Sequence, residues 1–364
     1  MEGVAVSGGG ALPDRGFWRG RRVFLTGHTG FKGTWARLWL TRLGAVVHGY
    51  ALAPESEPAL HTLVGPGADE TIADIRDHAR LAAALAAAAP EIVLHFAAQP
   101  LVRRGYGEPG ATFDVNVMGT VALLEAVRRT ASVRAVVVVT TDKVYRNDES
   151  GRPFGEDDRL GGGDPYSASK AACELVVDCW RRSWLAAQGV SVVTARGGNV
   201  VGGGDFAADR LVPDVVRAVA AGEAVRLRHP GATRPWQHVL DCLAGYLLLA
   251  EAAAGARDLG SVPEALNFGP MPGETETTVA GLAEAIGRAL GAQRPWIGAA
   301  SEAGGAEQRA LALDPRRASA ALGWRPRLSA EAMVAWTADW YAAWARGEDA
   351  RALTEAQIAA YEAL

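Results

Sequence analysis

The sequence predicts an α/β protein in which a doubly wound parallel sheet is accompanied by a smaller C-terminal domain. Three observations lead to this prediction. Short apolar runs rich in Val alternate with longer segments of helical periodicity, a glycine-rich turn follows the first apolar run, and the composition changes after residue 196. Continuous apolar strands separated by helices are typical of parallel sheets that are covered on both faces.

The expected elements alternate along the N-terminal half of the chain. We expect strands at residues 22–26, 45–51, 92–96, 135–140 and 190–195, and helices at 35–43, 77–89, 116–130 and 167–188. Beyond residue 196 the chain becomes rich in Gly, Pro and Trp, which indicates a second domain. We therefore divide the chain into a leader without fixed structure (1–16), a first domain (17–198 with 237–268) and a second, substrate-binding domain (199–236 with 269–364).

Composition and charge exclude several classes of protein. The net charge of −4 gives no reason to expect a nucleic-acid or membrane partner. The odd number of cysteines, without a C-x-x-C pair, indicates reduced thiols in a cytoplasmic protein. The histidines show no H-x-x-x-H spacing, so no metal site is expected. We expect no bilayer-spanning apolar run, and the N-terminus lacks the features of a signal peptide.

The turn after the first expected strand has the spacing G-x-x-G-x-x-G, with Gly27, Gly30 and Gly33. Glycine at these positions allows a tight turn, a close approach of a pyrophosphate to the backbone, and close packing of the following helix. The free N–H groups at a helix N-terminus favour a bound phosphate. The turn therefore predicts a Rossmann-type dinucleotide site that also includes Thr29, Phe31 and Lys32.

The adenosine end of this site is less well defined by the sequence. Dinucleotide-binding folds usually end the second strand with an acidic residue, but residues 48–53 contain none. Lys32 and Arg37 are either surface charges or partners for a 2′-phosphate, so the choice between NAD and NADP stays open. Asp74 and Ile75 are either an adenine contact or a turn.

The segment that ends the next strand lies where ligands bind in such sheets, at the carboxyl edge. It reads His-Phe-Ala-Ala-Gln, and its small residues would let a cofactor pack closely. The expected cofactor contacts here are Phe96, Ala97, Ala98 and Gln99.

A Y-x-x-x-K motif supplies the expected catalytic pair, Tyr166 and Lys170. The two side chains share one helix face, and a nearby ammonium group favours the phenolate. We expect the pKa of Tyr166 to be lowered, so that it accepts a proton from a substrate hydroxyl. The alternative is an ordinary helix pair.

A second group of reactive side chains ends the strand at 135–140. The hydroxyl of Thr141 would share the substrate hydroxyl with Tyr166, and Asp142 and Lys143 are an acid and a base suited to two separate protons. The alternative for Asp142 and Lys143 is a strand-end turn with solvated charges.

Taken together, these segments resemble the extended short-chain dehydrogenase/reductases that modify sugar nucleotides, and more narrowly the CDP-glucose 4,6-dehydratase group. The resemblance runs from about residue 17 to about residue 344. Its longest matching segments are RGGNVVGGGDFAADRLVP at 196–213 and RPWQHV at 234–239; the shorter ones lie at 17–20, 27–33, 95–100, 141–145, 166–170, 322–326 and 337–344. Departures from the family pattern are Gly197, which is often Ala, and Phe206, which is often Trp.

The resemblance implies NAD as cofactor, CDP-glucose as substrate and a redox-neutral dehydration. The sugar is oxidised at C4, water leaves across C5 and C6, and the hydride returns to C6. Tyr166 would take the O4 proton, Asp142 would protonate the leaving C6 hydroxyl and Lys143 would remove the C5 proton, a role that Glu has in related enzymes. Asn116, Thr140, Tyr166 and Lys170 would complete the cofactor site.

The resemblance also implies the substrate contacts and the assembly. The expected substrate-binding residues are Gln99, Asn199, Leu211, Arg226, Arg234 and Trp236; an Arg guanidinium suits a diphosphate, and Trp236 is alternatively plain core. Helices at 116–130 and 167–188 commonly pair in this superfamily, so we expect a homodimer, possibly extended to a tetramer.

Three alternatives stay open at this point. The chain is otherwise a sugar-nucleotide 4-epimerase, a 4,6-dehydratase for a dTDP-, GDP- or UDP-sugar, or a non-catalytic NAD-sensing regulator. Such regulators typically lose the catalytic Tyr or Lys, and both are present here. The expected pathway is deoxysugar supply for a surface polysaccharide such as O-antigen.

Overall fold

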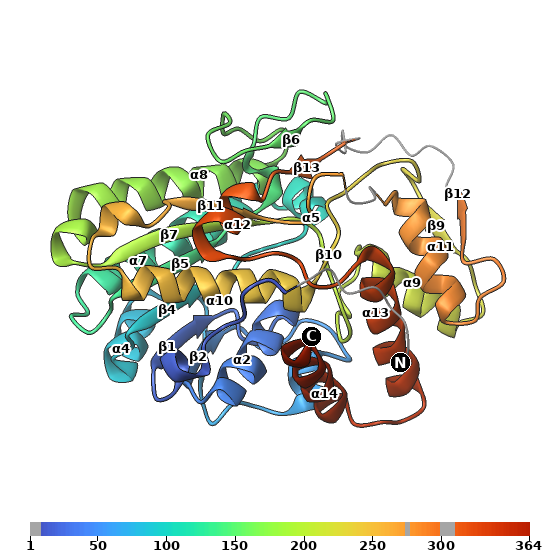
Figure 1. The fold of residues 1–364 in the computed structure, drawn as a ribbon, viewed down its shortest axis with the longest axis horizontal. Helices are drawn as coiled ribbons and strands as arrows, with labels where there is room; N and C mark the ends of the chain where they lie inside the picture. Colours follow the sequence, from blue (N-terminus) through green and yellow to red (C-terminus); the bar gives the residue numbers. More distant parts are fainter. Residues whose placement is uncertain (1–8, 274–276, 299–309) are drawn as a thin grey trace.

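The computed structural model describes residues 9–273, 277–298 and 310–364 (Figure 1). Its centre is a parallel sheet of seven strands in the order β11-β7-β5-β4-β1-β2-β3 among the described residues. The strands are β1 (Arg22–Thr26), β2 (Val46–Ala51), β3 (Asp69–Ile72), β4 (Ile92–His95), β5 (Ala135–Val139), β7 (Ser191–Gly197) and β11 (Ala265–Phe268). The predicted doubly wound α/β fold is confirmed.

Alternate residues of each central strand enter different layers of the core. Val137 and Val139 of β5 pack with α2 (Phe31–Leu43) and α10 (Val239–Gly255). Val136 and Val138 pack on the opposite face with α4 (His78–Ala88), α7 (Gly119–Arg128) and α8 (Pro165–Trp180). Because successive strand residues point to opposite faces, a strand buried on both sides must be apolar throughout. Full burial of each such side chain contributes roughly 1.5–3 kcal/mol.

Local signals in the sequence set the limits of these helices. Asp164 caps α8 by accepting a hydrogen bond from Ser167 N, and Pro165 takes the first helical position. Asp77 caps α4 in the same way. Helix α2 ends at Gly44, whose φ of +92° is the left-handed conformation that glycine adopts at little cost.

The second part of the chain forms small elements beside the carboxyl end of the sheet (Figure 1). These are β8 (Val200–Val201) with β10 (Gln237–His238), β9 (Val225–Leu227) with β12 (Trp296–Gly298), α9 (Leu211–Ala220), α11 (Val279–Ala289), α12 (Arg316–Leu322) and α13 (Ala330–Ala345). A further small sheet joins β6 (Pro153–Phe154), from the first part of the chain, to β13 (Ala312–Leu313). The last helix, α14 (Ala350–Ala363), packs on α2.

The expected helix at 116–130 is longer in the structure. It begins as α6 (Pro109–Phe113), passes through a π-helical turn at Asp114–Met118 and continues as α7. Residues Pro109–Arg128 reach the length and apolar composition of a membrane span, contrary to the expectation from the sequence, but half of that stretch is buried inside the protein. Burial of this kind is typical of a core helix, and length and composition alone are weak evidence for a span.

The expected leader is only partly outside the fold. Residues 1–8 lie outside the described residues, but Ala11 N donates to Gly323 O at 2.9 Å, and Arg327 donates to Gly10 O. Helix α1 (Arg15–Trp18) follows at once, and Trp18 is fully buried. The prediction of an unstructured segment is therefore wrong for residues 10–16, because Ala11 and Leu12 pack against the core.

Candidate active site

The carboxyl ends of β1, β4, β5 and β7 open into one cavity of about 1380 Å³. Segments of the second part of the chain form its opposite wall. The predicted site residues that line it are Gly27, Thr29, Gly30, Phe31, Lys32, Gly33, Asp74, Ile75, Phe96, Ala97, Ala98, Gln99, Thr140, Thr141, Asp142, Lys143, Tyr166, Lys170, Asn199, Leu211, Arg226, Arg234 and Trp236.

The glycine turn leaves room for a pyrophosphate at the N-terminus of α2. Gly27 has a φ of +75°, and a Cβ there would lie 2.7 Å from Ala97 N. A Cβ on Gly33 would clash with Gly27 O, so this glycine permits the close packing of the helix. A Cβ on Gly30, in contrast, would meet only Gly27 O at 3.4 Å among the described residues. Gly30 also supplies no side-chain cap, so the first N–H groups of α2 face a cradle that fits a dinucleotide phosphate.

Asn116 is the one predicted site residue that is not among the described residues lining the cavity. Its side chain is 1% exposed, accepts from Gln99 N at 2.8 Å and donates to Ser169 Oγ at 2.9 Å. Asn116 therefore holds the segment at Gln99 against α8, and its predicted contact with the cofactor stays a prediction.

Lys32 lines the cavity, as expected for a residue of the glycine turn, whereas Arg37 is not in the described lining. The Lys32 amino group lies 5.8 Å from the ring centre of Tyr246 on α10, toward the catalytic side of the cavity, and desolvation lowers its pKa. Arg37 is buried and donates to Gly65 O at 2.7 Å, and it is absent from the described cavity lining. Neither Lys32 nor Arg37 is a surface charge. Arg37 is not placed for a 2′-phosphate, because its guanidinium is hydrogen-bonded to the backbone at Gly65.

Asp74 and Ile75 line the cavity just beyond the end of β3. The Asp74 carboxylate is paired with Arg76 at 2.6 Å, and hydrogen bonds from Arg76 lower the pKa of Asp74. The Ile75 side chain is fixed by α7, since a Cβ on Gly119 would lie 2.8 Å from it. Both residues therefore have set positions at this edge.

The Y-x-x-x-K pair projects from the first two turns of α8 into the cavity. The Lys170 amino group donates to Val139 O at 2.9 Å at the end of β5, and burial lowers its pKa. Burial also raises the pKa of Tyr166 to about 12, although the Thr141 hydroxyl acts to lower it. The lowered pKa expected for Tyr166 is thus wrong for the protein alone, because desolvation of the phenolate outweighs its neighbours.

Asp142 and Lys143 form a contact at the end of β5. Lys143 Nζ lies 3.1 Å from Asp142 Oδ1 and 3.3 Å from Asn199 Oδ1. Asp142 Oδ1 also accepts from Thr141 Oγ1 at 2.8 Å, whereas Asp142 Oδ2 is buried with no hydrogen-bond partner in the described part of the chain. An acid, a base and a free carboxylate oxygen therefore meet within reach of Tyr166, in place of a solvated turn.

A buried carboxylate that sequence reasoning missed anchors this group of strand ends. Glu174 accepts hydrogen bonds from Thr140, at 2.5 Å, from Thr194, at 2.8 Å, and from both sides of the Arg196 guanidinium. It stands one helical turn beyond Lys170, so a search for residues at i+4 on the same face would have found it. Glu174 ties β5 and β7 to the helix that carries the catalytic pair.

The wall formed by the second part of the chain is rich in arginine. Besides Arg226 and Arg234, the lining includes Arg210, Arg217 and Arg228, which the sequence did not single out. The N-terminus of α9 opens on the same wall, with Leu211 as its first residue and no side-chain cap among the described residues. Trp236 both packs against the core and lines the cavity, with its Nε1 donating to Thr277 O at 3.0 Å. This wall suits a second diphosphate.

Gly197 and Phe206, the two departures from the family pattern, both line the cavity. A Cβ on Gly197 would clash with the Tyr246 phenol, so Tyr246 fills the space that a larger residue would need. Phe206 packs on Trp344, with ring centres 4.9 Å apart.

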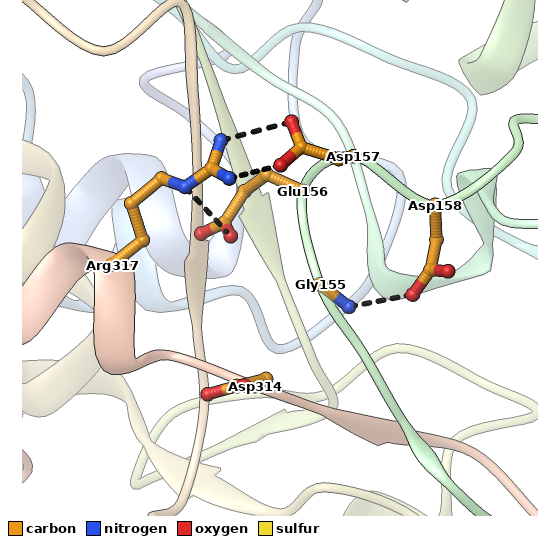
Figure 2. A pocket seen from close by; sticks show the side chains of 6 residues that line it. All are labelled: Gly155, Glu156, Asp157, Asp158, Asp314 and Arg317. Atoms are coloured by element: carbon orange, nitrogen blue, oxygen red, sulfur yellow. Dashed lines mark hydrogen bonds and ion pairs between the residues drawn. The ribbon is translucent and has the colours of Figure 1, made fainter.

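A second hollow, of about 300 Å³, is unsuited to an anionic ligand (Figure 2). Figure 2 shows Arg317 pointing at Asp157 and Glu156, and the ion pairs with these two carboxylates neutralise the charge of its guanidinium. The other residues that line this hollow are Gly155, Asp158 and Asp314. The large cavity at the sheet edge is therefore the candidate active site.

Comparisons with known proteins agree with a dinucleotide-binding fold and with this site. Residues 23–269 match the model of the NAD dependent epimerase/dehydratase family. The chain is 42% identical to CDP-glucose 4,6-dehydratase of Salmonella typhimurium over 96% of this chain and 98% of that protein. It is 34% identical to dTDP-glucose 4,6-dehydratase of Streptomyces antibioticus over 74% of each chain. Its fold is similar to UDP-glucose-4-epimerase from Stenotrophomonas maltophila, solved with NAD, with a TM-score of 0.76, 25% identity, and coverage of 90% and 100% of the two chains.

Proposed function

The chain belongs to the NAD dependent epimerase/dehydratase family, and from this premise we propose that it dehydrates CDP-D-glucose to CDP-4-dehydro-6-deoxy-D-glucose. The enzyme is a hydro-lyase that uses NAD. The observation that carries the proposal is the contact between Asp142 and Lys143, in the same cavity as Tyr166. The identity to the Salmonella CDP-glucose enzyme supports the choice of nucleotide.

Bound NAD supplies a hydride acceptor for C4 and a hydride donor for C6. Tyr166 accepts the proton of the C4 hydroxyl, and the Thr141 hydroxyl beside it helps to hold that oxygen. The ammonium of Lys170 lies on the same helix face and favours the phenolate during proton transfer. Lys170 is held in place by its hydrogen bond to Val139 O.

The elimination of water across the C5–C6 bond requires two proton transfers, one from C5 and one to the hydroxyl that leaves C6. In the form that reacts, the proton of the Asp142–Lys143 contact lies on Asp142. The neutral amine of Lys143 removes the C5 proton, which the C4 ketone has made acidic, and the carboxylic acid of Asp142 gives its proton to the leaving C6 hydroxyl. Asp142 Oδ2 has no partner in the described residues, so it is free to face the leaving group. The contact of Lys143 with Asn199 Oδ1 keeps the base directed toward the substrate.

The nucleotide lies along the arginine-rich wall. Arg226 and Arg234 bind the diphosphate, which also approaches the open N-terminus of α9 at Leu211. Trp236, Asn199 and Gln99 shape the cavity around the base and the sugar. This division of labour corresponds to a dinucleotide-binding domain (17–198 with 237–268) and a substrate-binding domain (199–236 with 269–364).

The proposed assembly is a cytoplasmic homodimer. Large apolar side chains are exposed on the helices that such enzymes pair, namely Phe113, Met118, Leu175 and Trp184. The three cysteines are free, as expected in a reducing compartment. The product is a keto-deoxysugar nucleotide, which suits deoxysugar supply for a surface polysaccharide such as O-antigen.

Mass spectrometry of the products from CDP-, dTDP-, UDP- and GDP-glucose tests the proposal. CDP-glucose should give a product that is lighter by one water. A product of unchanged mass would indicate a 4-epimerase instead, because epimerisation needs Tyr166 and Lys170 but not the acid and base at 142 and 143. Turnover of dTDP- or UDP-glucose without turnover of CDP-glucose would overturn the assignment of the nucleotide.

A further inference from the structure

Two imidazoles and a carboxylate meet behind the glycine turn, outside the candidate active site. His28 comes from the turn after β1, His61 from α3 (Leu60–Val64) and Glu70 from β3. One ligand atom from each lies within 4.8 Å of the other two. Glu70 Oε2 is 3.3 Å from His28 Nε2, and Glu70 Oε1 is 3.7 Å from His61 Nε2. The carboxylate therefore lies between the two rings.

Three nitrogens of these rings make no hydrogen bond of good geometry in the described part of the chain, although His28 Nε2 lies near Glu70. His28 is 0% exposed, and neither of its ring nitrogens has a hydrogen-bond partner among the described residues. His61 Nδ1 is also buried and without a partner there. A buried polar atom without a partner costs roughly 1–3 kcal/mol, and such an atom often marks an ion or water that belongs to the site.

The His28 ring is held rigidly in this position. A Cβ on Gly49 of β2 would lie 2.5 to 2.7 Å from three atoms of the ring, so the glycine makes the space that the imidazole fills. The turn on one side and β2 on the other leave the ring little freedom. The His28 donor is therefore set in place before any ligand binds.

We propose that His28, His61 and Glu70 bind one divalent transition-metal ion, with Zn²⁺ the best match to two imidazoles and a carboxylate. Zn²⁺ takes nitrogen and carboxylate oxygen at about 2.0–2.2 Å, so neighbouring ligands of a tetrahedral ion stand about 3.4 Å apart. The 3.3 Å between Glu70 Oε2 and His28 Nε2 matches this spacing, whereas the 3.7 Å between Glu70 Oε1 and His61 Nε2 requires a small shift of the side chains on binding. A water molecule completes the tetrahedron.

The charges around the cluster suit neutral imidazole ligands. Burial lowers the pKa of His28 to about 4 and also lowers the pKa of His61, so both rings are available as ligands at neutral pH. The carboxylate of Glu70 offsets part of a metal's charge. The positive charge of Arg37 disfavours both a protonated imidazole and a bound metal ion, and so lowers the affinity of the site for the metal. Its guanidinium is, however, directed to Gly65 O.

The site lies apart from the candidate active site, and it does not depend on the proposed function. None of its three residues is in the described lining of the active-site cavity. A bound ion would join the glycine turn, α3 and β3, and so brace the turn that holds the dinucleotide. The spacing rules that predicted no metal could not detect this site, because its ligands come from three separate segments.

The test uses the full chain, first treated with a chelator and then dialysed against Zn²⁺ or Co²⁺. We expect about one ion per chain by elemental analysis, a rise in Tm on adding Zn²⁺, and the intense visible absorption of tetrahedral Co²⁺. His61→Gln and Glu70→Gln should each lose the ion and the rise in Tm. His48→Gln is the matched control, because it removes a different imidazole, 2.7 Å from Asp69 on the same pair of strands.

Two outcomes would overturn the proposal. One is a wild-type chain whose Tm and metal content do not change between the chelated and Zn²⁺-treated forms, a comparison that needs no variant to fold. The other is equal metal binding by wild type and Glu70→Gln, which would mean an adventitious ion only.

Discussion

Lys143 Nζ lies 3.1 Å from Asp142 Oδ1, while Asp142 Oδ2 remains buried without a partner in the described chain. The Lys143 amino group and the near oxygen of Asp142 hold each other in place, and the far oxygen is left for the substrate. This arrangement assigns the two proton transfers of an elimination to two neighbouring residues. It is the feature that an epimerase does not need.

Replacing Asp142 by Asn should therefore stop the reaction after the first hydride transfer. The amide cannot protonate the leaving hydroxyl, so we expect product formation to fall by about 10²–10⁴-fold. Reduced cofactor should accumulate, visible as nicotinamide absorbance after mixing with CDP-glucose. The exposed Asp148→Asn is the control and should behave as wild type. Near-wild-type turnover in Asp142→Asn would contradict the assignment.

The fit between Gly197 and Tyr246 predicts a compensating pair of substitutions. Gly197→Ala should lower Tm and weaken cofactor retention, because the new methyl group clashes with the Tyr246 phenol. Tyr246→Phe alone should be nearly neutral, since in the described part of the chain the phenol loses only a weak contact with the Cys242 thiol. The double variant should regain much of the lost stability in a double-mutant cycle. Additive losses would show that the clash is not the cause.

Glu174 and Arg196 form a buried ion pair at 2.8 Å that fixes the strand ends beneath the catalytic residues. Glu174→Gln leaves the Arg196 charge buried and poorly paired, so the free energy of unfolding should fall by about 3–5 kcal/mol. Glu174→Gln combined with Arg196→Met should be more stable than Glu174→Gln alone, as measured by denaturant unfolding. A double variant less stable than the single one would contradict this account.

Asp241 predicts a pH dependence of stability. Burial raises its pKa to about 7, while it accepts from Arg327 N and the Tyr361 hydroxyl at 2.7 Å each. A raised pKa means that the folded state holds the proton more tightly, so this contribution is complete below about pH 4 and is lost as pH rises through about 7. As pH rises across that window, the free energy of unfolding of Asp241→Asn should therefore increase relative to that of wild type, by up to about 4 kcal/mol. A constant difference in unfolding free energy across the same window would exclude the effect.

The sequence predicted five of the seven strands of the described sheet, because the central strands are apolar on both faces. The strands β3 (Asp69–Ile72) and β11 (Ala265–Phe268) were not among the expected ones. The prediction for β1 (Arg22–Thr26) has the observed limits, and the helix at 167–188 begins within two residues of α8. Local signals were sufficient here, since buried parallel strands and capped helices both leave a pattern in neighbouring residues.

The sequence was less informative where an outcome depends on packing. The direction of Lys32, the burial of Arg37 and the raised pKa of Tyr166 all follow from what surrounds each side chain, and periodicity does not contain that information. Asn116 is polar and lies close to the site, but its amide is used to hold Gln99. Residues 10–16 have a leader-like composition, and only their contacts with residues near 323–327 give them a structure.

The most direct test of the central claim follows one deuterium. CDP-glucose labelled with deuterium at C4 should give a product that has lost one water and carries the label at C6, because the hydride removed from C4 returns to the same sugar. Tyr166→Phe should give no labelled product while the cofactor stays bound. A product without the label at C6, or one of unchanged mass, would contradict the account.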